Sequence, residues 1–188
     1  MVKLQFAKTS KGATVPSKRE GDAGYDLYID RDWFNMNKGV IMLLSQGETS
    51  LFPLGLKSVI PNEYYAQIQE RGSTGVHAMK YGAGVIDAYF RGEWNIIITN
   101  CNSKPIFIYD DSIVRDKKEV IREYFATKMC SSLENIVLDD YVFYPISKGI
   151  AQFVLLPVPQ VEIEEVTEKD IELNITERGT GMLGSSGK

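Results

Sequence analysis

Histidine and cysteine are scarce in this sequence, and their scarcity excludes several kinds of site. His77 is the only histidine, so a mechanism that needs two histidines in one chain, such as the HExxH zinc site, is excluded. A Ser-His-Asp triad stays formally open, but the sequence has no GxSxG nucleophile elbow. Cys101 and Cys130 are far apart and form no CxxC motif, so we expect two buried free thiols and neither a disulfide framework nor a zinc site.

The sequence also lacks an excess of basic residues and a long apolar run. Its 21 Lys and Arg residues stand against 25 Asp and Glu residues, and the net charge of −4 argues against binding to nucleic acid or an anionic membrane. No apolar run approaches the roughly 20 residues that cross a bilayer. The first residues, MVKLQF, alternate apolar and polar side chains, which predicts a strand and not a signal peptide. We therefore expect a cytoplasmic protein whose chemistry rests on carboxylates, amides, hydroxyls or a bound metal.

Short runs of β-branched and aromatic residues recur along the chain, separated by Gly, Pro, Asn and Asp. This pattern predicts an all-β sandwich or barrel and not alternating βα units. The runs lie at residues 25–29, 40–44, 49–52, 56–60, 64–69, 94–99, 106–109, 150–156 and 161–166. Residues 116–129 depart from the pattern, because Val120, Ile121, Tyr124 and Phe125 recur at helical spacing with charges on the other face. They predict one amphipathic helix.

Two glycine-rich segments adjoin predicted strands. The segment GDAGYDL at 21–27 enters a strand, and ERGSTG at 70–75 follows one. The second combines Arg71 with two hydroxyls and two glycines, which suits a phosphate because amides converge there and a guanidinium can form paired hydrogen bonds. A plain β-turn explains the first segment, and an exposed loop explains the second equally well.

Two further segments allow a structural or a functional interpretation. The segment GVIDAYFRGEW at 84–94 is typical of a β-hairpin with aromatic residues at its tip. Its backbone could pair with a flat base while Asp87 faces a sugar hydroxyl or a water. The tail RGTGMLGSSGK at 178–188 contains GxGxxG but leaves no room for the helix of a dinucleotide site. It is either a disordered end or a flap whose amides, hydroxyls and Arg178 close over phosphates.

In order, AGYDL, RGSTG, GVIDAYFRGE, GIAQF and RGTGMLGSSG resemble the ordered motifs of the homotrimeric dUTPase (dUTP pyrophosphatase) family. The match runs from Ala23 to Gly187. The resemblance implies an all-β, jelly-roll-like domain over 1–177, a mobile flap over 178–188, and a homotrimer whose subunits share active sites. It also implies Mg²⁺ as cofactor and hydrolysis of dUTP to dUMP and pyrophosphate, by in-line attack of water on the α-phosphorus.

The resemblance assigns roles to single residues. Asp87 matches the catalytic aspartate, which touches the deoxyribose 3′-hydroxyl and orients the attacking water. Asp26 matches the aspartate that helps to hold Mg²⁺ through water. The substrate-binding positions are Arg71, Gly72 and Ser73 in the second motif, Gly84, Ile86 and Phe90 in the third, Gln152 in the fourth, and Arg178, Leu183, Gly184, Ser185 and Ser186 in the flap.

Several of these positions depart from the usual pattern of the family. Gly72 stands where a serine is common, and Phe90 aligns with the tyrosine that packs on the deoxyribose. Lys148 and Gly149 stand where an acidic residue and an arginine usually precede Ile-Ala-Gln, and Leu183 replaces the phenylalanine that stacks on uracil. These departures keep open a regulatory, protein-binding homologue with weakened catalysis. A dCTP deaminase also stays open, because it shares the fold and is compatible with GVID followed by Arg-Gly.

The third and fourth motifs lie further apart than the family usually allows. The extra residues span roughly 103–144 and include the predicted helix. Phage members of the family sometimes carry an insertion here. An isolated short helix is marginal in water, so its apolar face must pack on something. We expect it to pack on its own β core or a neighbouring subunit; a docking surface for another protein is the alternative.

Overall fold

The computed structural model describes residues 2–127, 137–176 and 179. The chain divides into two compact units, Met1–Val158 and Pro159–Lys188. Most of the predicted flap, including Arg178, Leu183, Gly184, Ser185 and Ser186, lies outside the described residues. The predicted boundary between residues 177 and 178 therefore stays a prediction.

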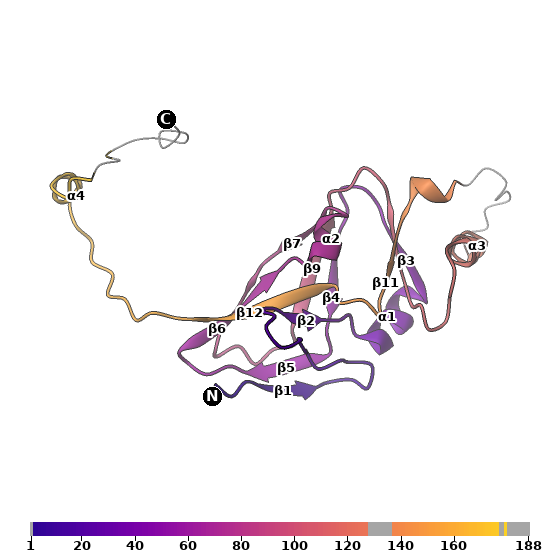
Figure 1. Cartoon of the computed structure of the whole chain (residues 1–188), viewed down its shortest axis with the longest axis horizontal. Helices are drawn as coiled ribbons and strands as arrows, with labels where there is room; N and C mark the ends of the chain where they lie inside the picture. Colours follow the sequence, from indigo (N-terminus) through magenta and orange to yellow (C-terminus); the bar gives the residue numbers. More distant parts are fainter. Residues whose placement is uncertain (1, 128–136, 177–178, 180–188) are drawn as a thin grey trace. The chain divides into compact units, whose positions relative to one another are not determined.

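The first unit contains every strand of the described residues (Figure 1), so the predicted all-β class is confirmed. Its elements in chain order are β1 (Gln5–Lys8), β2 (Tyr25–Leu27), α1 (Arg31–Lys38), β3 (Ile41–Leu44), β4 (Thr49–Pro53), β5 (Leu56–Val59), β6 (Tyr64–Gln69), α2 (Gly72–Gly75), β7 (Met79–Gly82), β8 (Val85–Ile86), β9 (Asn95–Asn100), β10 (Ile106–Tyr109), α3 (Lys117–Thr127), the 3-10 turn η1 (Leu138–Asp140), β11 (Val142–Pro145) and β12 (Ala151–Pro157). The second unit contains α4 (Glu168–Glu172).

The strands form small sheets that pack around one main core. The sheet that carries the site has the order β2-β12-β6-β8, and the others are β4-β9-β7, β11-β10-β3 and β1-β5. In β9, buried and partly exposed residues alternate, as expected for a strand with one face on the core. Trp94 is fully buried in that core, donates from Nε1 to the Ser58 hydroxyl over 3.0 Å, and packs edge-on against Phe6 and Phe153.

One predicted strand and the predicted hairpin are wrong. Residues 161–166 are not a strand, although Val161 and Ile163 alternate with glutamates. A strand needs a hydrogen-bonding partner, and the described part of the second unit contains no other strand. Residues 84–94 turn at Asp87, but β8 pairs with β6 and β9 pairs with β4 and β7. The turn therefore joins two sheets and is not the tip of a hairpin.

The predictions for the two cysteines have different outcomes. Cys101 is a free thiol, as predicted, but it is exposed and not buried, because it follows the end of β9 where the chain leaves the sheet. Cys130 lies outside the described residues. No helix within the described ranges has the length and apolar character needed to cross a membrane.

The first helix, α1, was not predicted, although its capping residue is visible in the sequence. Asp30 is almost fully buried and accepts hydrogen bonds from the backbone amides of Asp32 and Trp33 at 3.0 and 3.4 Å. These bonds satisfy amides that have no partner inside the helix. Phe34 buries its side chain in the main core, and Gly39 ends the helix at a φ of 66°.

The predicted insertion contains a parallel crossover. Strand β10 pairs antiparallel with β3 and parallel with β11, and α3 lies in the connection between β10 and β11. The predicted helix is thereby confirmed over its described part. Because β10 is fully buried between two neighbours, it belongs to the sheet, and the connection itself spans residues 110–141.

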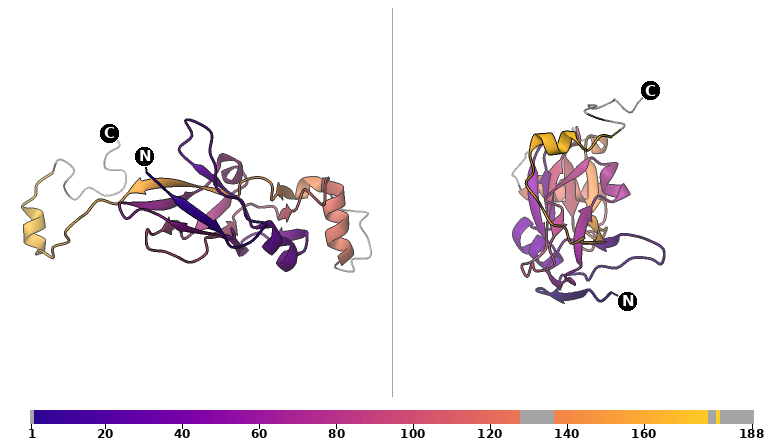
Figure 2. Two further views of the ribbon diagram at one scale, coloured as in Figure 1. Left: turned by 90° about the horizontal axis from the view of Figure 1, so that it is seen from below. Right: turned by 90° about the vertical axis from the view of Figure 1, so that its left-hand side faces the viewer.

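The crossover has a hydrophobic cluster of its own. Helix α3 lies at one end of the strand layers (Figure 2) and buries Val120 and Ile121. They pack with Ile41, Phe107 and Tyr109, which lie on β3 and β10. The expectation that the helix packs on its own β core is therefore confirmed.

Candidate functional site

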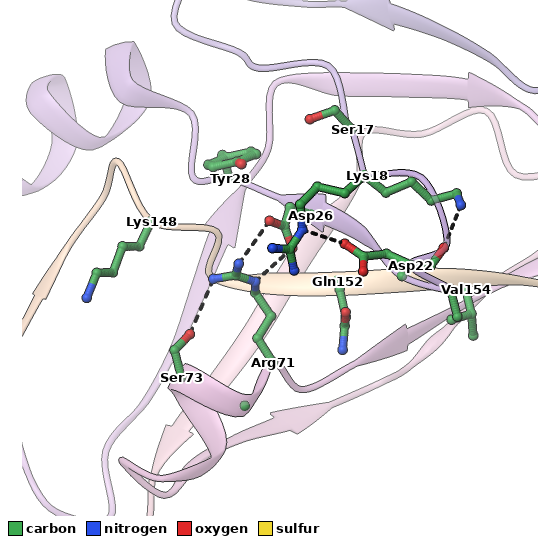
Figure 3. A pocket seen from close by; sticks show the side chains of 14 residues that line it. Ser17, Lys18, Asp22, Asp26, Tyr28, Arg71, Ser73, Lys148, Gln152 and Val154 are labelled. Carbon is green, nitrogen blue, oxygen red and sulfur yellow. Dashed lines mark hydrogen bonds and ion pairs between the residues drawn. The ribbon is translucent and has the colours of Figure 1, made fainter.

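The site is a pocket of about 890 Å³ on the face of the β2-β12-β6-β8 sheet (Figure 3). Its position follows from the strand register. Gln152 on β12 lies directly opposite Asp26 on β2 and opposite Gln69 on β6. Directly opposed residues in antiparallel strands place their side chains on the same face. Two residues beyond Gln69, the chain turns and brings Arg71 to that face.

Arg71 and Asp26 form a two-point ion pair at the centre of the pocket. Arg71 Nε donates to Asp26 Oδ1 over 2.8 Å, and Nη2 donates to Oδ2 over 2.9 Å. Arg71 Nη1 donates to the Gly149 carbonyl over 3.0 Å and to Ser73 Oγ over 3.3 Å. Burial acts to lower the pKa of Arg71, but the hydrogen bonds and charge of Asp26 outweigh it and raise the pKa. This guanidinium is a fixed cation.

The turn after β6 is closed by Thr74. Its hydroxyl accepts a hydrogen bond from the Arg71 amide and donates to the Arg71 carbonyl, both over 3.0 Å. Because Thr74 is fully buried, the short helix α2 is fixed on the core while Gly72 and Ser73 face the pocket. The phosphate-type turn expected at 70–75 is thus a rigid turn that presents a cation, a hydroxyl and a glycine.

Gln152 is held in the pocket by a close approach to Gly24. Its Nε2 donates to the Glu70 carbonyl over 2.7 Å. A Cβ on Gly24 would lie 2.7 Å from Gln152 Cδ, and real Cβ atoms do not approach other atoms so closely. A side chain at Gly24 would therefore displace the Gln152 side chain, which occupies that space.

The residues of the third motif do not line this pocket. Asp87 is exposed, and its carbonyl accepts a hydrogen bond from the Phe90 amide that closes the turn. Phe90 packs over Gly92 and remains 41% exposed. Ile86 pairs with Ala66 on β6. The structure therefore brings together Asp26, Arg71, Gly72, Ser73 and Gln152, while Asp87, Ile86 and Phe90 stand apart from them.

Gly84 presents its backbone beside the β6 strand. Its carbonyl accepts from the Ile68 amide over 2.7 Å and from Gln67 Nε2 over 3.1 Å. Gly84 also lines a separate pocket of about 340 Å³ with Gln67, Glu70 and Tyr81. The Gly84 carbonyl is thus occupied by this chain's own donors.

Three cationic side chains of the pocket wall were not predicted as site residues. Lys18, Arg19 and Lys148 line the pocket. Together with Arg71 they make four cationic side chains, against two carboxylates, Asp22 and Asp26. An excess of cations in a cleft favours an anionic ligand. The adjacent Lys18 and Arg19, just before the first motif, were a signal that could have been used. Tyr28 also lines the pocket, and no sequence pattern marked it.

The one histidine has a structural position. The His77 ring meets the Tyr144 ring edge-on with centroids 6.4 Å apart, and the His77 carbonyl accepts from Asn102 Nδ2 over 3.1 Å. Across the described residues, no cluster of three or more His, Cys, Asp or Glu side chains could by itself hold a metal ion.

The chain is similar to known proteins over its whole length. The family model described as dUTPase matches residues 10–112. The deoxyuridine 5′-triphosphate nucleotidohydrolase of Clostridium acetobutylicum is 30% identical, over 100% of this chain and 98% of that protein. That of Nautilia profundicola is 29% identical over the full length of both.

Solved structures show the same fold at lower identity. The dUTPase of Staphylococcus bacteriophage 80alpha, solved with dUPNHPP, is 22% identical, with a TM-score of 0.66 over 99% of both chains. The dUTPase of phage phi11 of S. aureus, described with a species-specific insert, is 19% identical, with a TM-score of 0.59 over 88% of this chain and 97% of that one. The ordered motifs, the jelly-roll-like fold and these matches together show that the chain belongs to the dUTPase family.

Proposed function

We propose that this chain hydrolyses dUTP to dUMP and pyrophosphate. The observation that carries the proposal is the Asp26–Arg71 pair in a cation-rich pocket shared with Ser73 and Gln152. The family membership supports dUTP as the substrate, because the relatives are named for that reaction. Arg71 contributes a fixed positive charge that attracts phosphate oxygens, although most of its N–H donors bond to Asp26, Ser73 and Gly149.

In the proposed reaction, the pocket binds the phosphate chain and restrains its geometry. Arg71, Ser73 and Gln152 would contact phosphate oxygens, and Lys148 on the rim would add a positive charge. Phosphoryl transfer depends mainly on such positioning and on stabilising charge, so rigid turns suit it. Arg178, Leu183, Gly184, Ser185 and Ser186 remain proposed as flap residues that would cover the substrate.

The donor set fits Mg²⁺ bound mainly through water and substrate. Magnesium keeps several waters and is commonly held by one or two carboxylates plus phosphates. Asp26, with Asp22 in the same pocket, supplies that number of carboxylates. We propose that Asp26 holds Mg²⁺ through water. The ion would supply neutralisation of charge on the phosphates. A variant of the phi11 phage dUTPase has a structural Mg(II) ion, which is a finding on that protein.

We propose that Asp87 acts as the base in the active site of a neighbouring subunit of a homotrimer. Asp87 is exposed and lies outside the pocket wall of its own chain. In the active site of the neighbouring subunit, Asp87 would position the attacking water and accept proton density from it. Phe90 would pack on the deoxyribose, and the backbone at Gly84 and Ile86 would contact the base.

The second unit also supports association between copies. Ile163, Leu173 and Ile175 are 92%, 72% and 91% exposed, and they share a short segment with Val161 and Ile171. Large apolar side chains gathered in one segment favour burial against another surface. A second copy of the chain is the partner that a shared site requires.

Mixing two inactive variants tests the shared site. Arg71→Ala and Asp87→Asn are each expected to lose most activity. If the two residues come from different subunits, co-expressed trimers regain about a quarter of their sites, because an intact residue of each kind can meet at one site. A mixture that stays inactive would place both residues in one subunit's site, and light scattering that shows an active monomer would contradict the trimer.

A substrate panel tests the reaction itself. With Mg²⁺, we expect dUMP and pyrophosphate from dUTP, and a much lower kcat/KM on dTTP and UTP. Orthophosphate as the product would contradict attack at the α-phosphorus. Ammonia from dCTP would indicate the deaminase, and no turnover on any nucleotide would indicate the regulatory homologue. A protein partner for the insertion at 103–144 stays a separate proposal, tested by binding after that segment is shortened.

A further inference from the structure

Two tyrosines outside the sequence motifs hold the backbone at the start of the fourth motif. Tyr144 on β11 is 1% exposed and donates its hydroxyl to the Gly149 carbonyl over 2.7 Å. Tyr81 on β7 is half-buried and donates its hydroxyl to the next carbonyl, that of Ile150. The two phenols come from different sheets, so they fix this segment from two sides. Strand β12 and Gln152 follow directly.

The same segment supports Arg71. The Gly149 carbonyl accepts from both Tyr144 Oη and Arg71 Nη1. Tyr144 Oη also lies 3.4 Å from Ser73 Oγ, within the same group of contacts. A Cβ on Gly149 would lie 3.1 Å from Arg71 Nε, so the guanidinium rests on the bare backbone of this glycine. A shift of Gly149 would therefore move Arg71 relative to Asp26.

The chemistry of Tyr144 suits a permanent donor. Burial raises the pKa of Tyr144, although the hydrogen bond with Ser73 and the charge of Arg71 act to lower it. The phenol therefore stays protonated at neutral pH and keeps donating to the carbonyl. Tyr144 does not line the pocket itself. Its effect on a ligand must pass through Gly149, Ser73 and Arg71.

We propose that Tyr144 and Tyr81 are positioning residues, which hold the Gly149–Ile150 backbone and thereby hold Arg71 in place for the phosphate chain of the substrate. The proposal rests on the proposed function, since it concerns the same pocket. It also gives a role to the glycine at 149, where the family usually has an arginine. A bare backbone carbonyl at this position anchors the arginine of the second motif.

The test compares Tyr144→Phe and Tyr81→Phe with a matched control, Tyr109→Phe. All three changes remove one hydroxyl and keep the ring. Tyr109 lies on β10, paired with Pro145 of β11, and packs in the second hydrophobic cluster. The ligands are dUPNHPP with Mg²⁺ and dUMP, with binding measured by calorimetry. Tyr144→Phe should weaken dUPNHPP about threefold to tenfold, the usual effect of one hydrogen bond, and weaken dUMP less. Tyr109→Phe should change neither.

A double-mutant cycle separates positioning from general loss of structure. In an Arg71→Ala background, Tyr144→Phe should have a much smaller effect on dUPNHPP affinity, because only its contact with Ser73 remains. Additive losses, equal losses for both ligands, or a Tyr144→Phe variant that matches Tyr109→Phe would overturn the proposal.

Inorganic triphosphate is the independent probe. Its affinity should fall in Tyr144→Phe whether or not the parent hydrolyses dUTP, because the positioned arginine meets phosphate in either case. A parent that binds triphosphate but does not turn over dUTP would therefore refute the proposed function alone. A parent that hydrolyses dUTP and a Tyr144→Phe variant with unchanged triphosphate affinity would refute the positioning role alone.

Discussion

A single methyl group added at Gly24 should disable the pocket by displacing Gln152. In Gly24→Ala, the new Cβ would lie 2.7 Å from Gln152 Cδ and 3.2 Å from its Cγ. The glutamine must leave its rotamer, and it then loses the 2.7 Å hydrogen bond to the Glu70 carbonyl. A lost hydrogen bond costs about 0.5–1.5 kcal/mol, and a strained rotamer costs a similar amount. The expected loss in the free energy of unfolding is therefore about 1–3 kcal/mol.

The functional loss has an upper bound set by Gln152 itself. Because Gly24→Ala acts by moving that side chain, it should lower kcat/KM for dUTP by no more than Gln152→Ala does. In the Gln152→Ala background the clash is absent, so adding Gly24→Ala should change nothing further. Gly82→Ala is the matched control, because its Cβ would make only an ordinary 3.5 Å contact with Ile97.

The assays are urea denaturation for stability and steady-state kinetics on dUTP, applied to the two single variants, the double variant and the control. Additivity of Gly24→Ala and Gln152→Ala would show that the glycine acts through some other contact. A Gly24→Ala protein with parental stability and kcat/KM would refute the steric argument altogether.

Three further predictions concern the base, a buried carboxylate and the crossover. Asp87→Asn should lower kcat about 10²- to 10⁴-fold while calorimetry shows dUPNHPP affinity nearly unchanged; near-parental kcat would make Asp87 a structural turn residue. For Asp110, burial acts to raise the pKa, but hydrogen bonds from Ser112 and Asn35 and the charge of Arg31 outweigh it and lower the pKa below 3.8. The charged carboxylate therefore stabilises the fold above pH 3.8, and this stabilisation is lost as the pH falls through the lowered pKa. In urea denaturation, Asp110→Asn should lower the free energy of unfolding by about 1–3 kcal/mol at pH 7 and by less in acid. An equal loss at both pH values would contradict this. Replacing residues 115–138 by a Gly/Ser linker of about ten residues, enough to return to a parallel strand, should lower Tm but keep kcat on dUTP, whereas a folded protein without turnover would show that the crossover builds the site.

Much of the sheet arrangement follows from local sequence patterns, and the exceptions have physical causes. Runs such as 64–69 and 106–109 became strands β6 and β10 with the expected bounds, since a core lies on one or both of their faces. Helix α1 was missed because Trp33 and Phe34 are typical of strands. Only the Asp30 cap and the burial of Phe34 reveal the helix. The run at 161–166 alternates like a strand but has no partner within the described part of its unit.

Only part of the candidate pocket could be predicted from the sequence, because Lys18, Arg19 and Lys148 were missed and Asp87 lies outside it. Asp26, Arg71, Ser73 and Gln152 were all identified from motifs, and the register of β2, β12 and β6 brings them together. Which of them touch one another depends on strand pairing between distant segments, which no local pattern encodes. Tyr144 shows this limit, since its place depends on the parallel pairing of β10 and β11 across the crossover.

The structure changes the interpretation of Gly149. In the sequence it is a missing arginine, which suggests a weaker phosphate site. In the structure, the space beside its Cα is filled by the Arg71 guanidinium, and its carbonyl is one of that guanidinium's acceptors. A Cβ at this position would lie 3.1 Å from Arg71 Nε, so the guanidinium would have to shift. Gly149 and the Arg71 guanidinium are therefore one arrangement, in which a bare glycine backbone supports the cation of the second motif.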